Sequence, residues 1–358
     1  MPSLKEIKVR INSISSTLAI TSAMKMVAAA KLQKAQMAIQ NMLPYERRLY
    51  SMLVDLMGAM NISAAASEDG SVRGSGSAER GFDQSGDRLS LSNRHDLAGM
   101  DGAYSLMAQR EVRKVAIVAF ASNSSLCGAF NSNAIREATA VINEYRASGL
   151  GDADITVYSV GRKMAEAMKK LGFPSPADFT KMSDSPSYDA ASALAQELFD
   201  GFVSGRFDKV ELVYNHYKST SSQPTTRQTY LPLSLADAIA DLQAGKIADS
   251  ASESDTNRGA EPVGAPVVRQ GSPTTEDLIV EPSKEALIAT LLPKVIRLRI
   301  FTTLLDSAAA EHAARTVAMQ LATDNGNDLL QELTLEYNKG RQQKITSEIL
   351  DLVGGSMQ

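Results

Sequence analysis

The first forty residues of the chain carry the pattern that most limits how it can fold. Large apolar residues recur there in alternating steps of three and four, at Leu4, Ile7, Ile11, Ile14 and Leu18. This spacing is typical of a coiled-coil seam, which keeps one apolar stripe facing a partner helix. The seam weakens at Thr21 and Lys25 and resumes from Ala28 to Met42. We expect a helix over residues 1–60, ended or kinked at Pro44, and a partner helix to cover it.

A second long helix is predicted near the C-terminus, from about residue 283 within the segment 278–358. Only one proline and two single glycines, Gly326 and Gly340, interrupt its pattern. At 1.5 Å per residue, about seventy helical residues span roughly 100 Å, and the first helix spans roughly 60–85 Å. A head of about 130 residues is only about 35–40 Å across. Both helices must therefore project, and pairing them in a long antiparallel coiled coil buries both apolar stripes.

Between the two helices, residues 111–240 alternate between strand and helix patterns. Buried strands are predicted at 115–120, 155–160 and 209–217, with an edge strand near 226–233. Helices are predicted after the first two strands and over 187–205. This alternation is typical of an α/β head domain of the Rossmann-like, three-layer kind.

Two further stretches, residues 61–110 and 241–277, are rich in Gly, Ser, Pro and charge. Such composition does not form a core of its own, so we expect two flexible insertions.

The composition excludes several kinds of site. With one cysteine, Cys127, the chain has no internal disulfide and no cysteine-based zinc site. Its three histidines are too far apart in sequence to indicate a metal motif, and no apolar run is long enough to span a membrane. The N-terminus enters a helix at once, so we expect neither a signal peptide nor a transit peptide. We therefore expect no catalytic, cofactor or metal site.

One loop invites a catalytic alternative. "SNSSLCGAFNSN" (122–133) follows a strand and opens a helix, which is where α/β folds bind phosphates. It matches no phosphate-loop fingerprint, however, and we expect its Asn and Ser residues to cap the helix instead. Cys127 is expected to be a small buried apolar residue. His312 is expected to lie on a helix beside a Glu311–Arg315 pair rather than to bind a metal.

Residues 1–40 carry six basic side chains against the single acid Glu6, although the whole chain has a net charge of -4. This asymmetry favours contact with an acidic partner surface about as much as a solvated coiled-coil exterior. Nucleic acid is a weaker candidate, because no reading module and no interleaved aromatic residues are present.

Three stretches resemble a known family. They are "SLKEIKVRINSISSTLAITSAMKMVAAAKLQKAQ", "SLCGAFNSN" and "EHAARTVAMQLATDNGNDLLQELTLEYNKGRQQKITSEILDLVGG". Together they closely resemble the gamma subunit of F-type ATP synthases. The resemblance implies a rotor without an active site of its own. Its coiled coil turns inside the ring of alpha and beta subunits, and its head rests on the membrane c-ring together with the epsilon subunit. Location at the cytoplasmic side of a bacterial inner membrane is implied too, as a peripheral subunit without a membrane span.

The resemblance also implies contact residues for the catalytic ring. These are Met24 and Lys25 in "AMKMVAA", Arg315 in "AARTVAM", and Arg341, Gln342 and Thr346 in "GRQQKIT". The polar break at Thr21 and Lys25 then either faces an outside partner or fixes the register of the coiled coil. Gly340 would add local compliance to the second helix. A coiled-coil scaffold without ATPase partners and an α/β enzyme using the 122–133 loop remain the alternatives.

Overall fold

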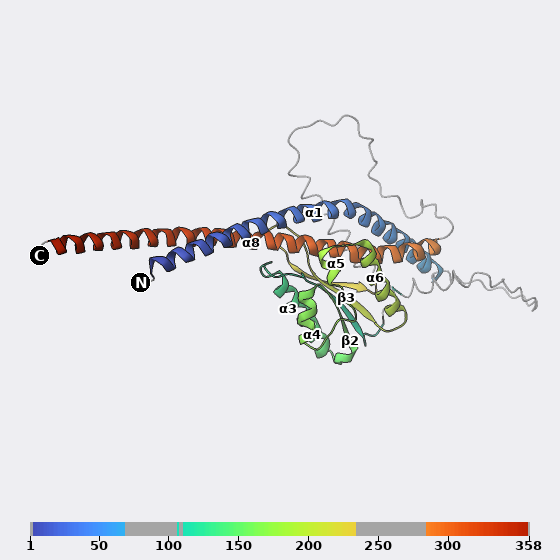
Figure 1. The fold of residues 1–358 in the computed structure, drawn as a ribbon. Helices are drawn as coiled ribbons and strands as arrows, with labels where there is room; N and C mark the ends of the chain where they lie inside the picture. The colour runs from blue at the N-terminus through green and yellow to red at the C-terminus, as the bar shows by residue number, and fades with distance from the viewer. Residues whose placement is uncertain (1–2, 69–105, 107–109, 234–283, 357–358) are drawn as a thin grey trace, which may run out of the picture.

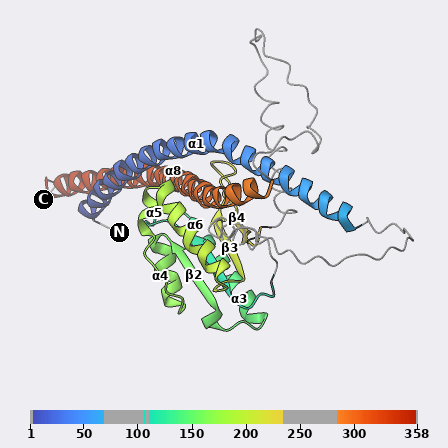
Figure 2. The same cartoon turned by 90° about the vertical axis from the view of Figure 1, so that its right-hand side faces the viewer.

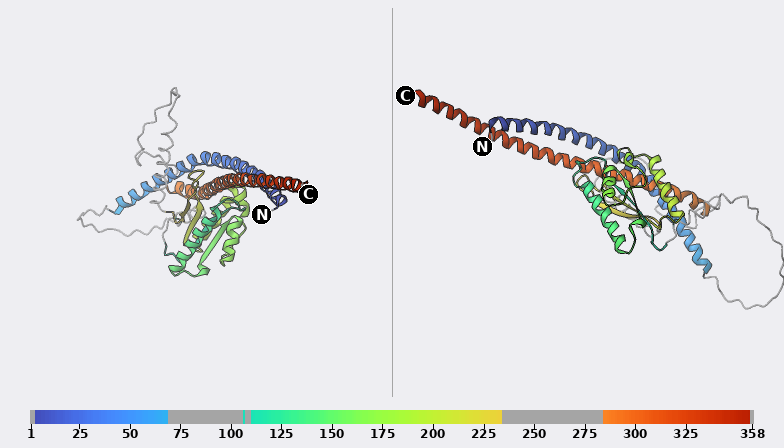
Figure 3. Two further views of the ribbon diagram at one scale, coloured as in Figure 1. Left: turned by 90° about the vertical axis from the view of Figure 1, so that its left-hand side faces the viewer. Right: turned by 60° about the horizontal axis from the view of Figure 1, so that its bottom comes forward.

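Two very long helices and a small α/β head make up the computed structural model, which describes residues 3–68, 106, 110–233 and 284–356 (Figure 1). Helix α1 (Leu4–Glu68) has 65 residues and helix α8 (Lys284–Ser356) has 73. They lie side by side, and both chain ends lie at the same end of the stalk (Figures 1 and 3). The head sits against one side of this pair (Figure 2). The predicted coiled coil and α/β head are both confirmed.

The pairing of α1 and α8 is antiparallel along its whole length. Leu4 lies against Gly340, Leu18 against Gly326, and the buried Leu32 packs with Ala309 and Ala313. Farther along, Arg299 donates a hydrogen bond to the hydroxyl of Tyr50. Each advance along α1 is thus matched by a retreat along α8, and the apolar stripe of α1 faces α8 as its spacing predicts.

The head contains one mixed sheet with the strand order β2-β1-β3-β4. Its strands are β1 (Val115–Phe120), β2 (Ile155–Val160), β3 (Lys209–Asn215) and β4 (Thr225–Leu231). Strand β1 pairs in parallel with β2 and β3, whereas β4 joins β3 antiparallel at the edge. The bounds of β1 and β2 agree with the predicted ones, and the edge strand is confirmed.

Helices cover both faces of the sheet, so the head has three layers. The helices of the head are α3 (Phe130–Ala147), α4 (Arg162–Lys170), α5 (Thr180–Asp184) and α6 (Tyr188–Val203). Ile117 of β1 packs in one core with residues of α3 and α4. Its neighbour Val118, which points to the opposite face, packs in a second core with Leu198 of α6, Leu292 of α8 and Leu53 of α1. The alternation of a strand's side chains thus joins head and stalk through one continuous core.

Three details differ from the sequence-based expectations, and one expectation is not tested. Helix α1 does not end at Pro44 or at residue 60 but runs to Glu68. Leu106, in the stretch expected to have no core, is fully buried among the second core's residues, and its carbonyl accepts a hydrogen bond from the backbone N–H of Leu233. Helix α3 has no side-chain cap, because Ala129 occupies the N-cap position. The predicted insertion 241–277 lies outside the described residues.

Candidate functional site

Where the apolar seam of α1 is interrupted at Thr21, the residue that contacts it belongs to the same chain. The hydroxyl of Thr323 on α8 donates a hydrogen bond of 3.1 Å to the hydroxyl of Thr21. A polar pair in an apolar seam is satisfied only when both members are in register, so it favours one alignment of the two helices. Thr21 therefore faces the partner helix. Lys25, one turn farther along, is half-buried.

Helix α8 carries its own seam, which the sequence analysis did not detect. Between Leu321 and Gly340 the residues that are less exposed than their neighbours are Ala322, Thr323, Gly326, Leu330, Leu333, Tyr337 and Gly340. Their spacing is that of a heptad pattern. Small and polar members hide it from a search for large apolar residues. The spacing of three and four residues between Thr323, Gly326, Leu330, Leu333, Tyr337 and Gly340 is nevertheless a signal that the sequence contains.

The two glycines of α8 lie where α1 approaches most closely. A Cβ added at Gly326 would be 2.6 Å from Cδ2 of Leu18, and one at Gly340 would be 3.0 Å from Cδ2 of Leu4. Gly326 therefore admits a leucine of the partner helix, whereas at Gly340 an added Cβ would require only a small shift of the end of Leu4. The expected local compliance at Gly340 stays a prediction.

Beyond Gly340, α8 continues alone as a single helix (Figure 3). Every residue from 341 to 350 is exposed. Apolar side chains are among them and just beyond: Ile345 is 46% exposed, Ile349 54% and Leu352 74%. Side chains of this kind are rarely left in water along a whole helix end unless a partner covers them. We call residues 341–356 the free tip.

The structure brings only some of the predicted contact residues together. Arg341, Gln342 and Thr346 share the free tip, and the Thr346 hydroxyl donates to the Gln342 carbonyl at 2.9 Å. Met24 and Lys25 are half-buried on α1, in the part of the stalk where Thr21 contacts Thr323 and Leu18 contacts Gly326, well before the tip.

Arg315 lies nearer the head on α8, and its side chain contacts residues of the same chain. Its side chain is only 11% exposed. One guanidinium nitrogen pairs with Glu311 at 2.7 Å, which confirms the predicted pair, and another donates to the hydroxyl of Ser124 at 2.6 Å. Burial raises the pKa of the Glu311 carboxyl despite the nearby guanidinium. Burial, with the charges of Arg315 and Lys31, lowers the pKa of His312 to about 4.

The 122–133 loop is a clamp between the head and α8. Cys127 and Phe130 are buried against Ala310 of α8. The side-chain amide of Asn131 donates to the hydroxyl of Ser122 at 2.9 Å and lies 3.1 Å from the Cys127 sulfur. The expected helix cap is wrong because this amide folds back into the loop instead. The prediction that Cys127 is a buried apolar residue is confirmed.

The charge of the paired helices is more balanced than α1 alone suggests. From Leu4 to Leu32, α1 carries five basic side chains and one acid. The stretch of α8 that lies beside it, from Glu311 to Gly340, carries five acids and two basic side chains. The asymmetry found in the sequence therefore belongs to one helix, and these two paired stretches together are close to neutral.

Within the described residues, no three His, Cys, Asp or Glu side chains gather closely enough to hold a metal ion. In the same part of the chain, no helix has the length and apolar character that crossing a membrane requires.

Comparison with known proteins identifies the family. A family model described as ATP synthase matches residues 3–357. The ATP synthase gamma chain of Phocaeicola vulgatus is 47% identical, and that of Bacteroides thetaiotaomicron 45%, each over 100% of both chains. A chain in the structure of the Euglena gracilis mitochondrial ATP synthase (OSCP/F1/c-ring) shares the fold with a TM-score of 0.54 and 18% identity, covering 99% of this chain and 93% of that one. With a coiled coil, a three-layer head and relatives this similar over their whole length, the chain belongs to the ATP synthase gamma chain family.

Proposed function

We propose that this gamma chain is the rotating central shaft that couples proton flow through the membrane sector of an ATP synthase to ATP synthesis in its catalytic ring. The free tip carries the proposal. A single helix that extends past its partner with exposed Ile345, Ile349 and Leu352 needs a surrounding protein surface. A bearing formed by alpha and beta subunits supplies one.

The shaft itself performs no chemistry in this proposal. It presents a different face to each beta subunit, and each face favours a different conformation of the catalytic site, as a ligand does when it binds one state better than another. Rotation then takes each site through binding, synthesis and release. Exposed Arg341, Gln342 and Thr346 meet the ring at the tip. Met24 and Lys25 meet it lower on the stalk.

Arg315 is assigned a different manner of contact. Because its guanidinium is held by Glu311 and Ser124, it stiffens the surface formed by α8 and the 122–133 loop, and this surface meets the ring. The head binds the c-ring and the epsilon subunit, which makes the chain a peripheral subunit on the cytoplasmic side of a bacterial inner membrane.

Reconstitution tests this function directly. Alpha and beta subunits are assembled with and without the chain, and a bead attached to the head reports rotation during ATP hydrolysis. Unidirectional rotation supports the proposal. Equal ATPase activity without the chain would refute it, and self-association of the purified chain without binding to the ring would favour a coiled-coil scaffold instead.

A further inference from the structure

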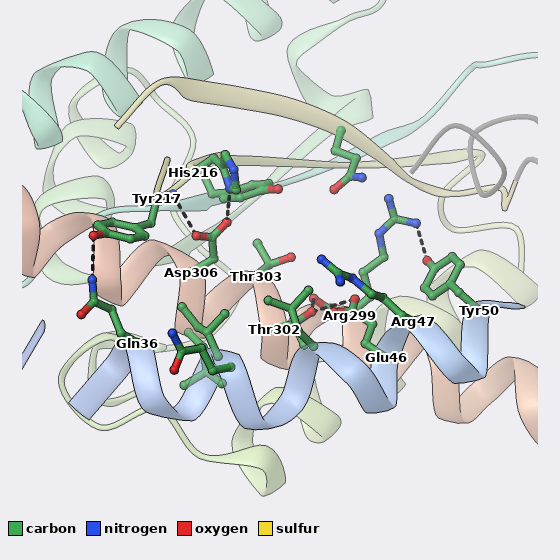
Figure 4. Close-up of a pocket in the computed structure, with 16 residues that line it drawn as sticks. Gln36, Glu46, Arg47, Tyr50, His216, Tyr217, Arg299, Thr302, Thr303 and Asp306 are labelled. Carbon is green, nitrogen blue, oxygen red and sulfur yellow. Dashed lines mark hydrogen bonds and ion pairs between the residues drawn. The ribbon is translucent and has the colours of Figure 1, made fainter. Parts of the chain in front are cut away.

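A cleft of about 500 Å³ lies where the head meets both helices of the stalk (Figure 4). Side chains of α1, of α8 and of strands β3 and β4 line it. Small-molecule sites in proteins are clefts of roughly 300–1,000 Å³, and they occur preferentially at interfaces between domains. The size and the place of this cleft therefore both fit a ligand site, for which the rotor function has no use.

Apolar packing fixes the walls of the cleft on both sides. On one side, Leu32 of α1 packs with Ala309 and Ala313 of α8. On the other side, Leu53 of α1 and Leu292 of α8 belong to the core that they share with the sheet. Because both clusters are close-packed, the walls cannot move together and fill the space without disrupting one of them. The cleft is therefore preformed, and a ligand that binds there does not have to order its walls.

The two carboxylates in the lining are held by hydrogen bonds at opposite ends of the cleft (Figure 4). At one end, Asp306 accepts a hydrogen bond of 2.9 Å from the backbone N–H of Tyr217 and lies 2.6 Å from Nδ1 of His216. At the other end, the hydroxyl of Thr302 donates to the Glu46 carboxylate at 3.0 Å. The positions of both acids are thus set by the chain itself.

Two arginines balance the charge of these acids. Arg47 and Arg299 also line the cleft, and Arg299 donates a hydrogen bond of 2.5 Å to the hydroxyl of Tyr50. Apart from His216, which contacts Asp306, the charged side chains in the lining therefore sum to zero. An ionised ligand of either sign would lose its hydration here without meeting an opposite net charge. The lining thus favours an uncharged ligand.

Most of the large side chains in the lining are aromatic or aliphatic. They are Ile39, Leu43, Tyr50, Tyr214, Tyr217 and Leu305. Aromatic rings prefer offset-stacked or edge-to-face contacts with another ring, and apolar walls favour the removal of an apolar ligand from water. Among the polar lining residues are Gln40 and Thr303, whose amide and hydroxyl groups can each donate and accept hydrogen bonds.

We propose that this cleft binds an uncharged, planar aromatic molecule that carries hydrogen-bonding groups on its rim. The rings lie against the tyrosines and leucines, and the rim groups bond to Gln40 and Thr303. This binding site goes beyond the proposed rotor function and does not depend on it, because one chain alone forms all of the walls.

The first test uses N-phenyl-1-naphthylamine as a probe and locates it on the purified full chain. This molecule is uncharged, has aromatic rings and one N–H group, and fluoresces strongly only in apolar surroundings. Because the chain has no tryptophan, a single introduced one reports the position of the probe by energy transfer. Exposed Gln33 lies three positions from Gln36 in the lining, whereas exposed Thr334 lies roughly 35 Å farther along the stalk.

The wild-type chain should bind one molecule of the probe saturably. Energy transfer to the probe should be efficient from Gln33→Trp and weak from Thr334→Trp. Absence of saturable binding would overturn the proposal. Stronger transfer from Thr334→Trp than from Gln33→Trp would overturn it too, because the probe would then lie on the exposed apolar side chains of the free tip.

The second test fills the cleft. Thr303→Phe enlarges a buried wall residue, and Gln40→Trp enlarges an exposed residue at the rim, so at least one should leave the fold intact by circular dichroism. Each folded variant should weaken probe binding by about ten-fold or more, since the added side chain occupies the ligand's space. Gln33→Trp and Thr334→Trp are the matched controls and should bind as the wild type does.

Unchanged affinity in a folded Thr303→Phe or Gln40→Trp chain would overturn the proposal. None of these measurements involves rotation, so their failure would leave the rotor function standing. Conversely, a chain that fails to rotate in the reconstituted ring could still bind the probe.

Discussion

The close approach of the two stalk helices at Gly326 predicts how a substitution there changes the free energy of unfolding. Replacing it by alanine removes the flexibility penalty of a helical glycine, which stabilises by about 1 kcal/mol. The new Cβ, however, would lie 2.6 Å from Cδ2 and 3.1 Å from Cγ of Leu18, where ordinary contact begins at 3.4 Å. Leu18 lies half-buried in the seam and must move by nearly an ångström.

Such overpacking costs about 1–3 kcal/mol, so Gly326→Ala should be neutral or should destabilise the chain by up to about 2 kcal/mol. Gly340→Ala is the matched control. Its Cβ would be 3.0 Å from only the far end of Leu4, in the first turn of α1. Because that side chain can move by a few tenths of an ångström, Gly340→Ala should stabilise the chain by up to about 1 kcal/mol.

A double-mutant cycle with Leu18→Ala isolates the contact, with urea unfolding followed by circular dichroism. Once Leu18 is shortened, Gly326→Ala should become stabilising, which corresponds to a coupling free energy of about 1–3 kcal/mol between the two sites. If Gly326→Ala stabilised both backgrounds equally, the glycine would not be needed for close approach and the reasoning would fail.

Three further predictions concern the head, Pro44 of α1 and the tip. Burial alone would raise the pKa of Glu211, but hydrogen bonds led by that from Arg227 lower it below 4.5, so Glu211→Gln should cost about 2–4 kcal/mol at neutral pH. That difference from the wild type should shrink as pH falls through the lowered pKa, whereas Glu144→Gln, at the exposed partner of Arg227, should cost under about 1 kcal/mol in the same urea titration. Pro44→Ala should raise the free energy of unfolding by up to about 3 kcal/mol, because an interior proline removes a helical hydrogen bond, and no change in the unfolding midpoint would contradict this. Deleting the free tip should change the free energy of unfolding by less than about 0.5 kcal/mol while lowering ATP-driven rotation torque, since residues 341–350 are exposed and would act only on a partner.

Patterns within one element were predictable from the sequence, and contacts between elements were not. The seam of α1 could be recognised in the sequence because Leu4, Ile7 and Ile11 are large and apolar. The seam of α8 could not, because Thr323 and Gly326 are identified as seam residues only by their contacts with Thr21 and Leu18 on α1. Contacts between elements also explain why Pro44 does not end α1.

Pro44 is flanked along α1 by residues buried against the rest of the fold, such as Leu32 and Leu49, and this packing keeps the helix continuous. Local propensity gives way when burial on both sides of a position is worth more.

Among the candidate site residues, too, features of one helix could be predicted from the sequence, and contacts between elements could not. The exposed tip residues Arg341, Gln342 and Thr346 were placed correctly on a projecting helix, since helix length alone requires projection. The engagement of Arg315 by Ser124 could not be predicted, because the two residues are 191 positions apart in the sequence. His216 and Asp306, 90 positions apart, gave no local signal either.

The antiparallel pairing of the first and last helices also has a consequence for biosynthesis. Thr21 and Thr323 are 302 positions apart, so α1 leaves the ribosome long before its partner exists. At about 5–20 residues per second, the apolar seam of α1 waits on the order of 15–60 s. The strands and helices of the α/β head are synthesised within that interval. One face of its sheet, however, stays uncovered until α8 supplies residues such as Leu292. The nascent chain thus exposes both this face and the apolar stripe of α1, which makes it a client for chaperones until α8 emerges.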